Sequence, residues 1–341
     1  MRSGFTVYSL LLLLSLVLAG GILHFTGDRW ENRLRLGFYR IKGDSIPSYS
    51  SVLTDSNGVP CVLYKPLNGV APGLQHNSTI VGNYAVDYYN QFIKTQDSAV
   101  LRKFKHCVKS LADSIHTING YSLFVFYWQQ PWYDSVKTPF YCGMTSGRAI
   151  EAFTDAWLLF RDSSYLQQAR QLLTGYFLPI EKGGFTYQYP QGWWYEELAD
   201  SNRHTPHILD GHIFAVTGVQ KFWQLTRNDS AKQIVDKGLA ALRYNLPRFD
   251  AGNGDIYYDW YQKKADQLYH ETLARQMKEL WQSTGDSIFH FYYKKWSAPL
   301  NQTYLLRIVK QKNRSGLLLF TIFSASIFLI FITLRRFVFK K

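Results

Sequence analysis

The residues best suited to chemistry gather in one stretch, from Gly183 to Phe214. It combines two adjacent carboxylates, Glu196 and Glu197, with aromatic residues, three histidines and two aspartates. Its glycines and proline rule out one continuous helix. We therefore expect a strand at the sequence WWYEE, followed by a helix that begins near His207. Strand alternation places Tyr195 and Glu197 on one face and Glu196 on the other, so one glutamate should face a cleft.

Four Asp-Ser dipeptides, which begin at residues 97, 162, 229 and 286, each separate two amphipathic segments. Such a dipeptide can cap the helix that follows it. The paired segments are 81–95 with 98–117, 146–161 with 163–178, 208–226 with 230–245, and 263–283 with 287–297. Four successive helical hairpins predict a mainly α fold, an α/α toroid or solenoid in which one helix of each pair lies inside.

The long connections between hairpins should carry the site, because the turns within the hairpins are short. These connections span about residues 118–145, 179–207 and 246–262. Hairpin geometry places all three at one end of the toroid, where functional loops gather. The first contains the run YWQQPWY at 127–133, and the third contains FDAGNGDIYYDW at 249–260.

Both ends of the chain carry an uncharged apolar run of 19 residues, Phe5 to Leu23 and Gly316 to Leu334. Each is long enough to cross a bilayer, although a cleaved signal peptide is the alternative for the first. We expect membrane helices at 5–25 and 315–334, a stalk with a small β element at 26–79, and the toroid at 80–300. The turn and alternating run from Asp55 to Tyr64 predict the β element.

The net charge of +13 indicates an anionic partner, which by charge alone is a lipid surface, a nucleic acid or an acidic polysaccharide. Basic residues beside the first apolar run weakly favour a cytoplasmic domain, but long domains often ignore this count. The cysteines, Cys61, Cys107 and Cys142, lack metal-site spacing. We therefore expect neither a disulfide framework nor a zinc site.

Residues from about Tyr84 to Trp296 resemble the C-terminal domain of the D-glucuronyl C5-epimerase family, which inverts C5 of glucuronate in heparan-type chains. Its most specific pieces here are WYEE at 194–197, ILDG at 208–211, GxGxIY at 252–257 and YH at 269–270, with a further segment at 144–148. The resemblance implies an isomerase that needs no cofactor and no metal.

The family's chemistry explains these residue types. The C5 hydrogen lies beside a carboxylate, so its removal requires an acid-base group on each face of the sugar and stabilisation of the enolate-like intermediate. The resemblance implies that Tyr257 and Tyr269 transfer protons and that Glu197 is the acidic partner. Substrate-binding residues are expected among the matched motifs and their neighbours: Trp194, Tyr195, Arg148, Asp210 and His270. Arg148, Lys263 or Lys264 would supply the uronate counter-charge.

The sequence also departs from the family pattern. Leu198 and Leu273 stand where the family has a functional tyrosine and a histidine, and Asp210 stands where it has an asparagine. Two alternatives therefore stay open: a lyase or hydrolase on the same toroid, and a noncatalytic glycan-binding component of polysaccharide assembly. The paired glutamates could also be a solvated pair, and the tyrosines and histidines could be core residues.

These observations lead to one expectation. The chain should be a membrane-anchored uronate epimerase whose partners are a glucuronate-containing polysaccharide and membrane lipid, with no nucleic acid and with a homodimer left open. The family precedent places the soluble domain on the noncytoplasmic side, against the weak charge count.

Overall fold

The computed structural model describes residues 2–42, 50–202, 204–310 and 313–338. It consists of two compact units, a helical unit of residues 48–297 and a terminal unit of residues 1–47 and 298–341. The predicted stalk is therefore not a separate domain. Its β element belongs to the helical unit, its first part continues the N-terminal helix, and residues 43–49 lie outside the described chain.

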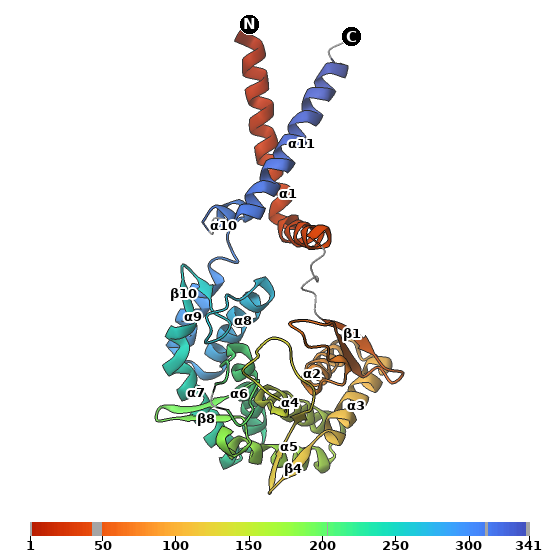
Figure 1. Cartoon of the computed structure of the whole chain (residues 1–341), viewed down its shortest axis with the longest axis vertical. Helices are drawn as coiled ribbons and strands as arrows, with labels where there is room; N and C mark the ends of the chain where they lie inside the picture. The colour runs from red at the N-terminus through yellow and green to blue at the C-terminus, as the bar shows by residue number, and fades with distance from the viewer. Residues whose placement is uncertain (1, 43–49, 203, 311–312, 339–341) are drawn as a thin grey trace. The chain divides into compact units, whose positions relative to one another are not determined.

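Four helical hairpins build the helical unit, as the sequence predicted (Figure 1). Their helices are α2 (Ser78–Thr95) with α3 (Ser98–Asp113), α4 (Gly143–Phe160) with α5 (Ser163–Leu173), α6 (Leu209–Thr226) with α7 (Asp229–Phe249), and α8 (Gln267–Thr284) with α9 (Ser287–Ser297). Two short 3₁₀ turns, Thr174–Phe177 and Ile180–Lys182, follow α5.

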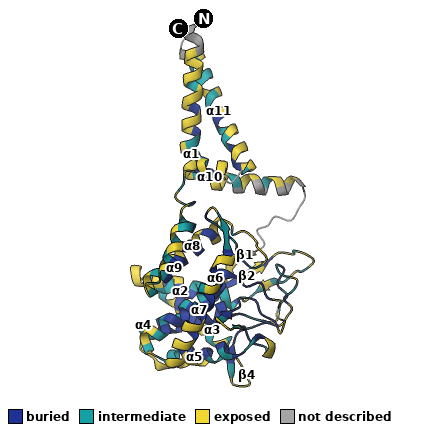
Figure 2. Ribbon diagram, turned by 90° about the vertical axis from the view of Figure 1, so that its left-hand side faces the viewer, coloured by how far each residue is buried: buried dark blue, intermediate teal, exposed yellow. Residues whose placement is uncertain are grey.

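The first helices of the hairpins pack against one another in sequence order, α2 on α4, α4 on α6 and α6 on α8. Helices α4 and α6 are accordingly buried along most of their lengths (Figure 2). Their close approach depends on glycine, since a Cβ on Gly147 or Gly218 would collide with the backbone of the opposite helix. One helix of each pair therefore lines the inside, which is the α/α-toroid arrangement.

Asp-Ser turns cap the second helices, with one shift from the prediction. Asp97 and Asp162 accept hydrogen bonds from Ala99 N and Ser164 N, as expected of N-caps. At the third turn the cap is Asn228, one residue earlier than the predicted Asp229, because its side chain reaches Ala231 N at 2.9 Å.

Small antiparallel sheets connect and flank the helices. Strands β1 (Ser50–Thr54), β2 (Pro60–Tyr64) and β3 (Gly73–Gln75) form one sheet, in which Thr54 pairs with Pro60 across the predicted turn. The other strands form two-stranded pairs: β4 (His116–Ile118) with β5 (Tyr121–Leu123), β6 (Val125–Phe126) with β7 (Phe140–Tyr141), β8 (Thr186–Tyr189) with β9 (Gly192–Tyr195), and β10 (Asp250–Gly252) with β11 (Asp255–Ile256).

The terminal unit contains α1 (Arg2–Lys42), α10 (Tyr304–Lys310) and α11 (Arg314–Val338). Thr6–Glu31 and Arg314–Phe337 are long and apolar enough to cross a membrane by length and composition. A polar contact joins the helices beside these spans: the Tyr304 hydroxyl donates to Glu31 at 2.6 Å, and Asn313 donates to the other Glu31 oxygen at 2.8 Å.

Candidate acid-base site

Glu196 and Glu197 directly follow the hairpin β8–β9, and their side chains have different surroundings. The Glu196 backbone stays paired, since its N–H donates to Phe185 O and its C=O accepts from Gly143 N. Its carboxylate contacts Thr205 and His207, whereas the Glu197 carboxylate packs on α6 at Gly211. The two neighbours thus belong to different clusters.

The Glu197 side chain occupies the space that a side chain at position 211 would fill, so that position requires glycine. A Cβ on Gly211 would lie 2.7 Å from Glu197 Cβ and would collide with its carboxylate. Within the described chain, Glu197 Oε2 and Asp210 Oδ1 are buried without a hydrogen-bond partner. Burial raises the pKa of Glu197 well above its usual range, and the charge of Asp210 adds to the rise.

Asp210 lies in the first turn of α6 and completes a carboxyl pair with Glu197. Burial raises its pKa to about 7, while hydrogen bonds from backbone N–H groups and from Tyr258 oppose the rise. Two carboxyls in such surroundings cannot both ionise easily, so the pair holds a proton near neutral pH. A group of this kind can both accept and return a proton.

Two tyrosines extend this pair toward the surface. The Tyr258 and Tyr269 rings lie 4.4 Å apart. The Tyr258 side chain also lies beside Asp210 and lowers the pKa of that carboxyl against the effect of burial. Tyr258 is buried, whereas Tyr269 is 36% exposed. Burial and the nearby carboxyls raise the pKa of both phenols. Tyr269, Tyr258 and Asp210 therefore form a row of neighbouring acid-base groups with one accessible end.

A second tyrosine–aspartate pair comes from two other connections. The Tyr133 hydroxyl donates to Asp259 at 2.6 Å, across 126 residues of sequence. Burial and this hydrogen bond raise the pKa of Tyr133, and the charges of Glu197 and Asp210 contribute. The charges of Glu197 and Asp210 act on Tyr133, so the three residues belong together electrostatically. Tyr133 is half-buried and therefore keeps access to the surface.

The three long connections meet here, which confirms the predicted convergence. Tyr141 and Ala199 exchange backbone hydrogen bonds, Lys137 N donates to Asp200 at 2.7 Å, and Leu209 N donates to Tyr258 O at 3.1 Å. We name the group formed by Glu197, Asp210, Tyr258, Tyr269 and Tyr133 the acid-base cluster.

The Glu196 side is a fully paired counterpart. Glu196 Oε1 lies 2.5 Å from His207 Nδ1 and accepts from the Thr205 hydroxyl at 2.7 Å, and Oε2 accepts from His207 N at 3.2 Å. The other His207 nitrogen is hydrogen-bonded to the Tyr189 hydroxyl. Every polar side-chain atom of this buried pair has a partner, which is typical of a structural hydrogen-bonded pair.

The structure brings Glu197, Asp210 and Tyr269 together but differs from the prediction at Tyr257. Tyr257 forms a backbone bridge with Lys264, and the next residue, Tyr258, is the one that contacts Asp210. Successive side chains of an extended segment point to opposite faces. We therefore assign to Tyr258 the place expected for Tyr257. Sequence reasoning missed Tyr133 and Tyr258, although both lie in the aromatic runs of the connections.

Trp194 and Tyr195 are core residues, which corrects their assignment to substrate binding. Both are 0% exposed. Trp194 stacks on His212 at 4.0 Å, and the Tyr195 hydroxyl donates to Ile234 O at 2.7 Å. Strand β9 ends at Tyr195, so the alternation that pairs Tyr195 with Glu197 does not continue. Neither side chain can reach a bound sugar.

Arg148 and His270 are likewise held by the fold. Arg148 donates to Asn83 of α2 at 2.9 Å and pairs with Glu151 at 2.7 Å, and His270 Nε2 is bonded to Trp296 O at 2.7 Å. Both side chains therefore have structural contacts, and neither belongs to the group of carboxyls and tyrosines around Glu197. Of the alternative cations, Lys264 pairs with Asp255, whereas the Lys263 ammonium lies 5.8 Å from the centroid of the Tyr258 ring.

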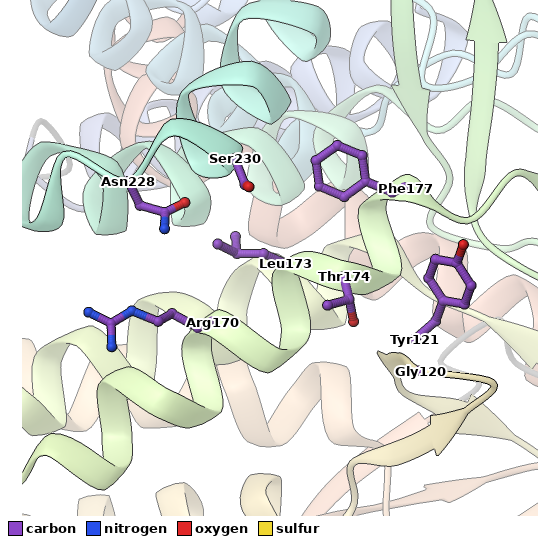
Figure 3. A pocket seen from close by; sticks show the side chains of 8 residues that line it. All are labelled: Gly120, Tyr121, Arg170, Leu173, Thr174, Phe177, Asn228 and Ser230. Atoms are coloured by element: carbon purple, nitrogen blue, oxygen red, sulfur yellow. The ribbon is translucent and has the colours of Figure 1, made fainter.

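Two further features help to delimit the site. In the described part of the chain, no group of three or more His, Cys, Asp and Glu residues could hold a metal ion. A surface pocket of about 350 Å³ lies elsewhere, between the β4–β5 turn, the end of α5 and the start of α7 (Figure 3). None of the residues that line this pocket belongs to the acid-base cluster. The pocket is therefore separate from the candidate site.

Comparison with known proteins decides the family. Residues 117–298, more than half of the chain, match the family model of the D-glucuronyl C5-epimerase C-terminus. The chain belongs to this family. The matched region contains the whole acid-base cluster and three of the four hairpins. Membership of the D-glucuronyl C5-epimerase family supports a carbohydrate epimerase-like enzyme.

Relatives and a solved structure agree with this assignment. The chain is 33% identical over 139 residues to an uncharacterized protein of Methanocaldococcus jannaschii, covering 40% of this chain and 44% of that protein. It is 28% identical over 128 residues to the D-glucuronyl C5-epimerase of Caenorhabditis elegans, covering 33% of this chain and 20% of that protein. The matches thus span less than half of either relative.

The fold also resembles the cellobiose 2-epimerase of Bacillus thermoamylovorans. The TM-score is 0.50 at 12% identity, with 87% of this chain and 86% of that chain covered. An identity this low shows the fold alone, and it agrees with the toroid that the helix order predicts.

Proposed function

We propose that this protein is a uronate C5-epimerase that acts on a glucuronate-containing polysaccharide while anchored to a membrane by its terminal helices. The observation that carries the proposal is the acid-base cluster: two neighbouring carboxyls, each with one buried oxygen that has no hydrogen-bond partner, beside Tyr258 and the accessible Tyr269. The C5–H of a uronate is a weak acid beside a carboxylate. Its removal and return require a group that exchanges protons near neutral pH.

The first half-reaction breaks the C5–H bond of the uronate. Tyr269 takes the C5 proton as its own proton passes through Tyr258 to the Glu197–Asp210 pair. The electron pair left on C5 spreads into the uronate carboxylate as an enolate-like intermediate. Lys263, whose ammonium lies beside the Tyr258 ring, supplies the counter-charge for this group.

The second half-reaction returns a proton to the opposite face of C5. Tyr133 is suited to this step, because it comes from a different connection and has its own carboxylate partner, Asp259. It would replace the family tyrosine whose position Leu198 occupies here, a residue that is buried at 8% exposure. Tyr133 then regains a proton from solvent, and the Glu197–Asp210 pair releases to solvent the proton that it gained, which restores the enzyme.

A lyase is the second candidate, and Leu198 is the observation that favours it. β-Elimination needs one base for the C5 proton and one acid for the leaving oxygen, so it does not require a tyrosine on each face. The product would be a shortened chain that ends in an unsaturated uronate.

The proposal is tested by incubating the purified 341-residue chain with heparosan and measuring glucuronate, iduronate and unsaturated uronate by NMR. Formation of iduronate with unchanged chain length is the expected result. Chain shortening with an unsaturated end would establish the lyase instead, and unchanged heparosan would contradict both.

A further inference from the structure

Arg248 lies near the end of α7 with an exposed side chain. Its guanidinium carbon is 4.7 Å from the centroid of the Trp260 ring. Among the described residues, no carboxylate forms an ion pair with it. The guanidinium is therefore held by an aromatic face and not by an acid, so its charge is available to a ligand.

The aromatic face under Arg248 is itself rigid. Trp260 also contacts His207, with centroids 3.8 Å apart, and His207 stacks on the buried Trp194 at 5.5 Å. His207 is fixed on both nitrogens, by Glu196 and by Tyr189. Trp260 therefore has a buried neighbour, His207, and an exposed neighbour, Arg248. The buried pair of Glu196 and His207 thus holds in place the ring on which the exposed Arg248 lies.

A guanidinium that lies flat on a ring keeps the N–H donors of its edge free. This edge matches two carboxylate oxygens, and the pair of parallel hydrogen bonds is among the stronger polar contacts in proteins. Because the contact with Trp260 restricts the Arg248 side chain, less rotamer freedom is lost when a carboxylate binds.

Other arginines stack on tryptophan here, but in a local way. Arg161 lies 4.7 Å from the Trp157 centroid, and Arg227 lies 5.4 Å from the Trp223 centroid. Each is the left-handed residue that ends a helix and covers the ring four residues earlier. Arg248 and Trp260 instead come from α7 and from the connection that carries Tyr258 and Asp259. This difference makes Arg161 a matched control.

Exposed aromatic residues join Arg248 to the acid-base cluster. Tyr244, 49% exposed, lies one helical turn before Arg248, and Tyr189 contacts Trp260 at 6.2 Å. On the other side, Tyr261 is 54% exposed and lies 5.9 Å from Tyr133 of the cluster. A polymer with one sugar at the cluster would therefore meet tyrosine rings on the way to Arg248.

We propose that Arg248, held on Trp260 and flanked by Tyr189 and Tyr244, is a second subsite that binds the carboxylate of another uronate in the same polysaccharide. The proposal rests on the proposed function for its substrate class. It adds a specificity-determining residue outside the acid-base cluster, which holds the polymer without taking part in proton transfer.

The test compares Arg248→Gln and Arg248→Lys with the control Arg161→Gln in the whole chain. Heparosan affinity is measured by calorimetry. Arg248→Gln should weaken binding about tenfold and Arg248→Lys by less, because lysine keeps the charge but not the two parallel hydrogen bonds. Arg161→Gln should bind like the unmodified chain. Carboxyl-reduced heparosan should bind the unmodified chain weakly and lose nothing further in Arg248→Gln.

Three outcomes would overturn the subsite: no binding of heparosan to the unmodified chain, equal losses in Arg248→Gln and Arg161→Gln, or an Arg248 effect that persists with the carboxyl-reduced polymer. Turnover separates the subsite from the proposed function. Arg248→Gln should raise KM with little change in kcat. Binding that depends on Arg248 without turnover would support the subsite and reject the epimerase. Turnover with binding that does not depend on Arg248 would support the epimerase and reject the subsite.

Discussion

Glu196 and Glu197 are adjacent, yet the fold treats them in opposite ways. Glu196 is 0% exposed, and its carboxylate is satisfied by Thr205 and His207. Glu197 packs on Gly211, keeps a buried oxygen without a partner, and has a raised pKa. A satisfied buried carboxylate stabilises structure, whereas an unsatisfied one beside a second carboxyl is a common mark of a functional site. The comparison assigns stability to one glutamate and chemistry to the other.

The largest expected effect is that of Glu197→Gln. An amide of the same shape cannot share a proton with Asp210, so conversion of glucuronate to iduronate should fall about 10³-fold. The measurement is the initial rate of iduronate formation by NMR, with heparosan binding unchanged as evidence that the fold survives.

Glu196→Gln is the matched control for that variant. Loss of the buried pair with His207 should lower the free energy of unfolding by about 3 kcal/mol, measured by thermal melting. Activity per folded molecule should change far less than in Glu197→Gln. Equal losses of activity in the two variants would remove the distinction between the two sides.

Tyr133→Phe sharpens the comparison by testing the second face of the sugar. Conversion should fall about 10²-fold in both directions, because one of the two proton-transfer groups is missing. Solvent exchange at C5 should survive for one epimer, with retained configuration. Heparosan and an iduronate-rich polymer, each in heavy water, provide the two substrates, and undiminished conversion would exclude Tyr133 from the reaction.

A comparison of Tyr258→Phe with Tyr257→Phe tests which of the two tyrosines takes part in proton transfer in the acid-base cluster. The first variant interrupts the row from Tyr269 to Asp210 and should slow conversion about 10²-fold. The second should stay within a few fold of the unmodified chain. A reversed order would restore the assignment to Tyr257 that the family resemblance implies.

The last expected effect is on stability and not on turnover: Asp210→Asn should change how the free energy of unfolding depends on pH. The pKa of Asp210 in the folded chain, about 7, exceeds its ordinary value of 3.8. Its contribution to the free energy of unfolding is therefore fully present below pH 3.8 and is lost as the pH rises from 3.8 to 7. Asparagine does not titrate. Relative to the unmodified chain, the variant should therefore gain about 4 kcal/mol between pH 4 and pH 8, because each pKa unit is worth about 1.4 kcal/mol. Melting at both pH values measures this, and a constant difference would show that Asp210 is not perturbed.

Much of the fold followed from local patterns. The spacing of apolar residues and the Asp-Ser turns located all four hairpins, and hairpin geometry predicted that the connections would meet. These features depend on neighbouring residues in the sequence.

The site was harder to predict because its contacts are distant in sequence. The bonds from Arg148 to Asn83 and from Tyr133 to Asp259 span 65 and 126 residues. In the irregular third connection no period distinguishes Tyr257 from Tyr258. Trp194 and Tyr195 are amphipathic side chains whose burial depends on α6 and α7, which no local pattern reveals.

The most direct test of the account is solvent hydrogen exchange at C5 of heparosan, measured by NMR in heavy water with the unmodified chain and with Glu197→Gln. We expect deuterium at C5 together with iduronate for the unmodified chain, and neither above background for the variant. Deuterium incorporation at equal rates by both proteins would contradict the assignment of chemistry to the Glu197 side.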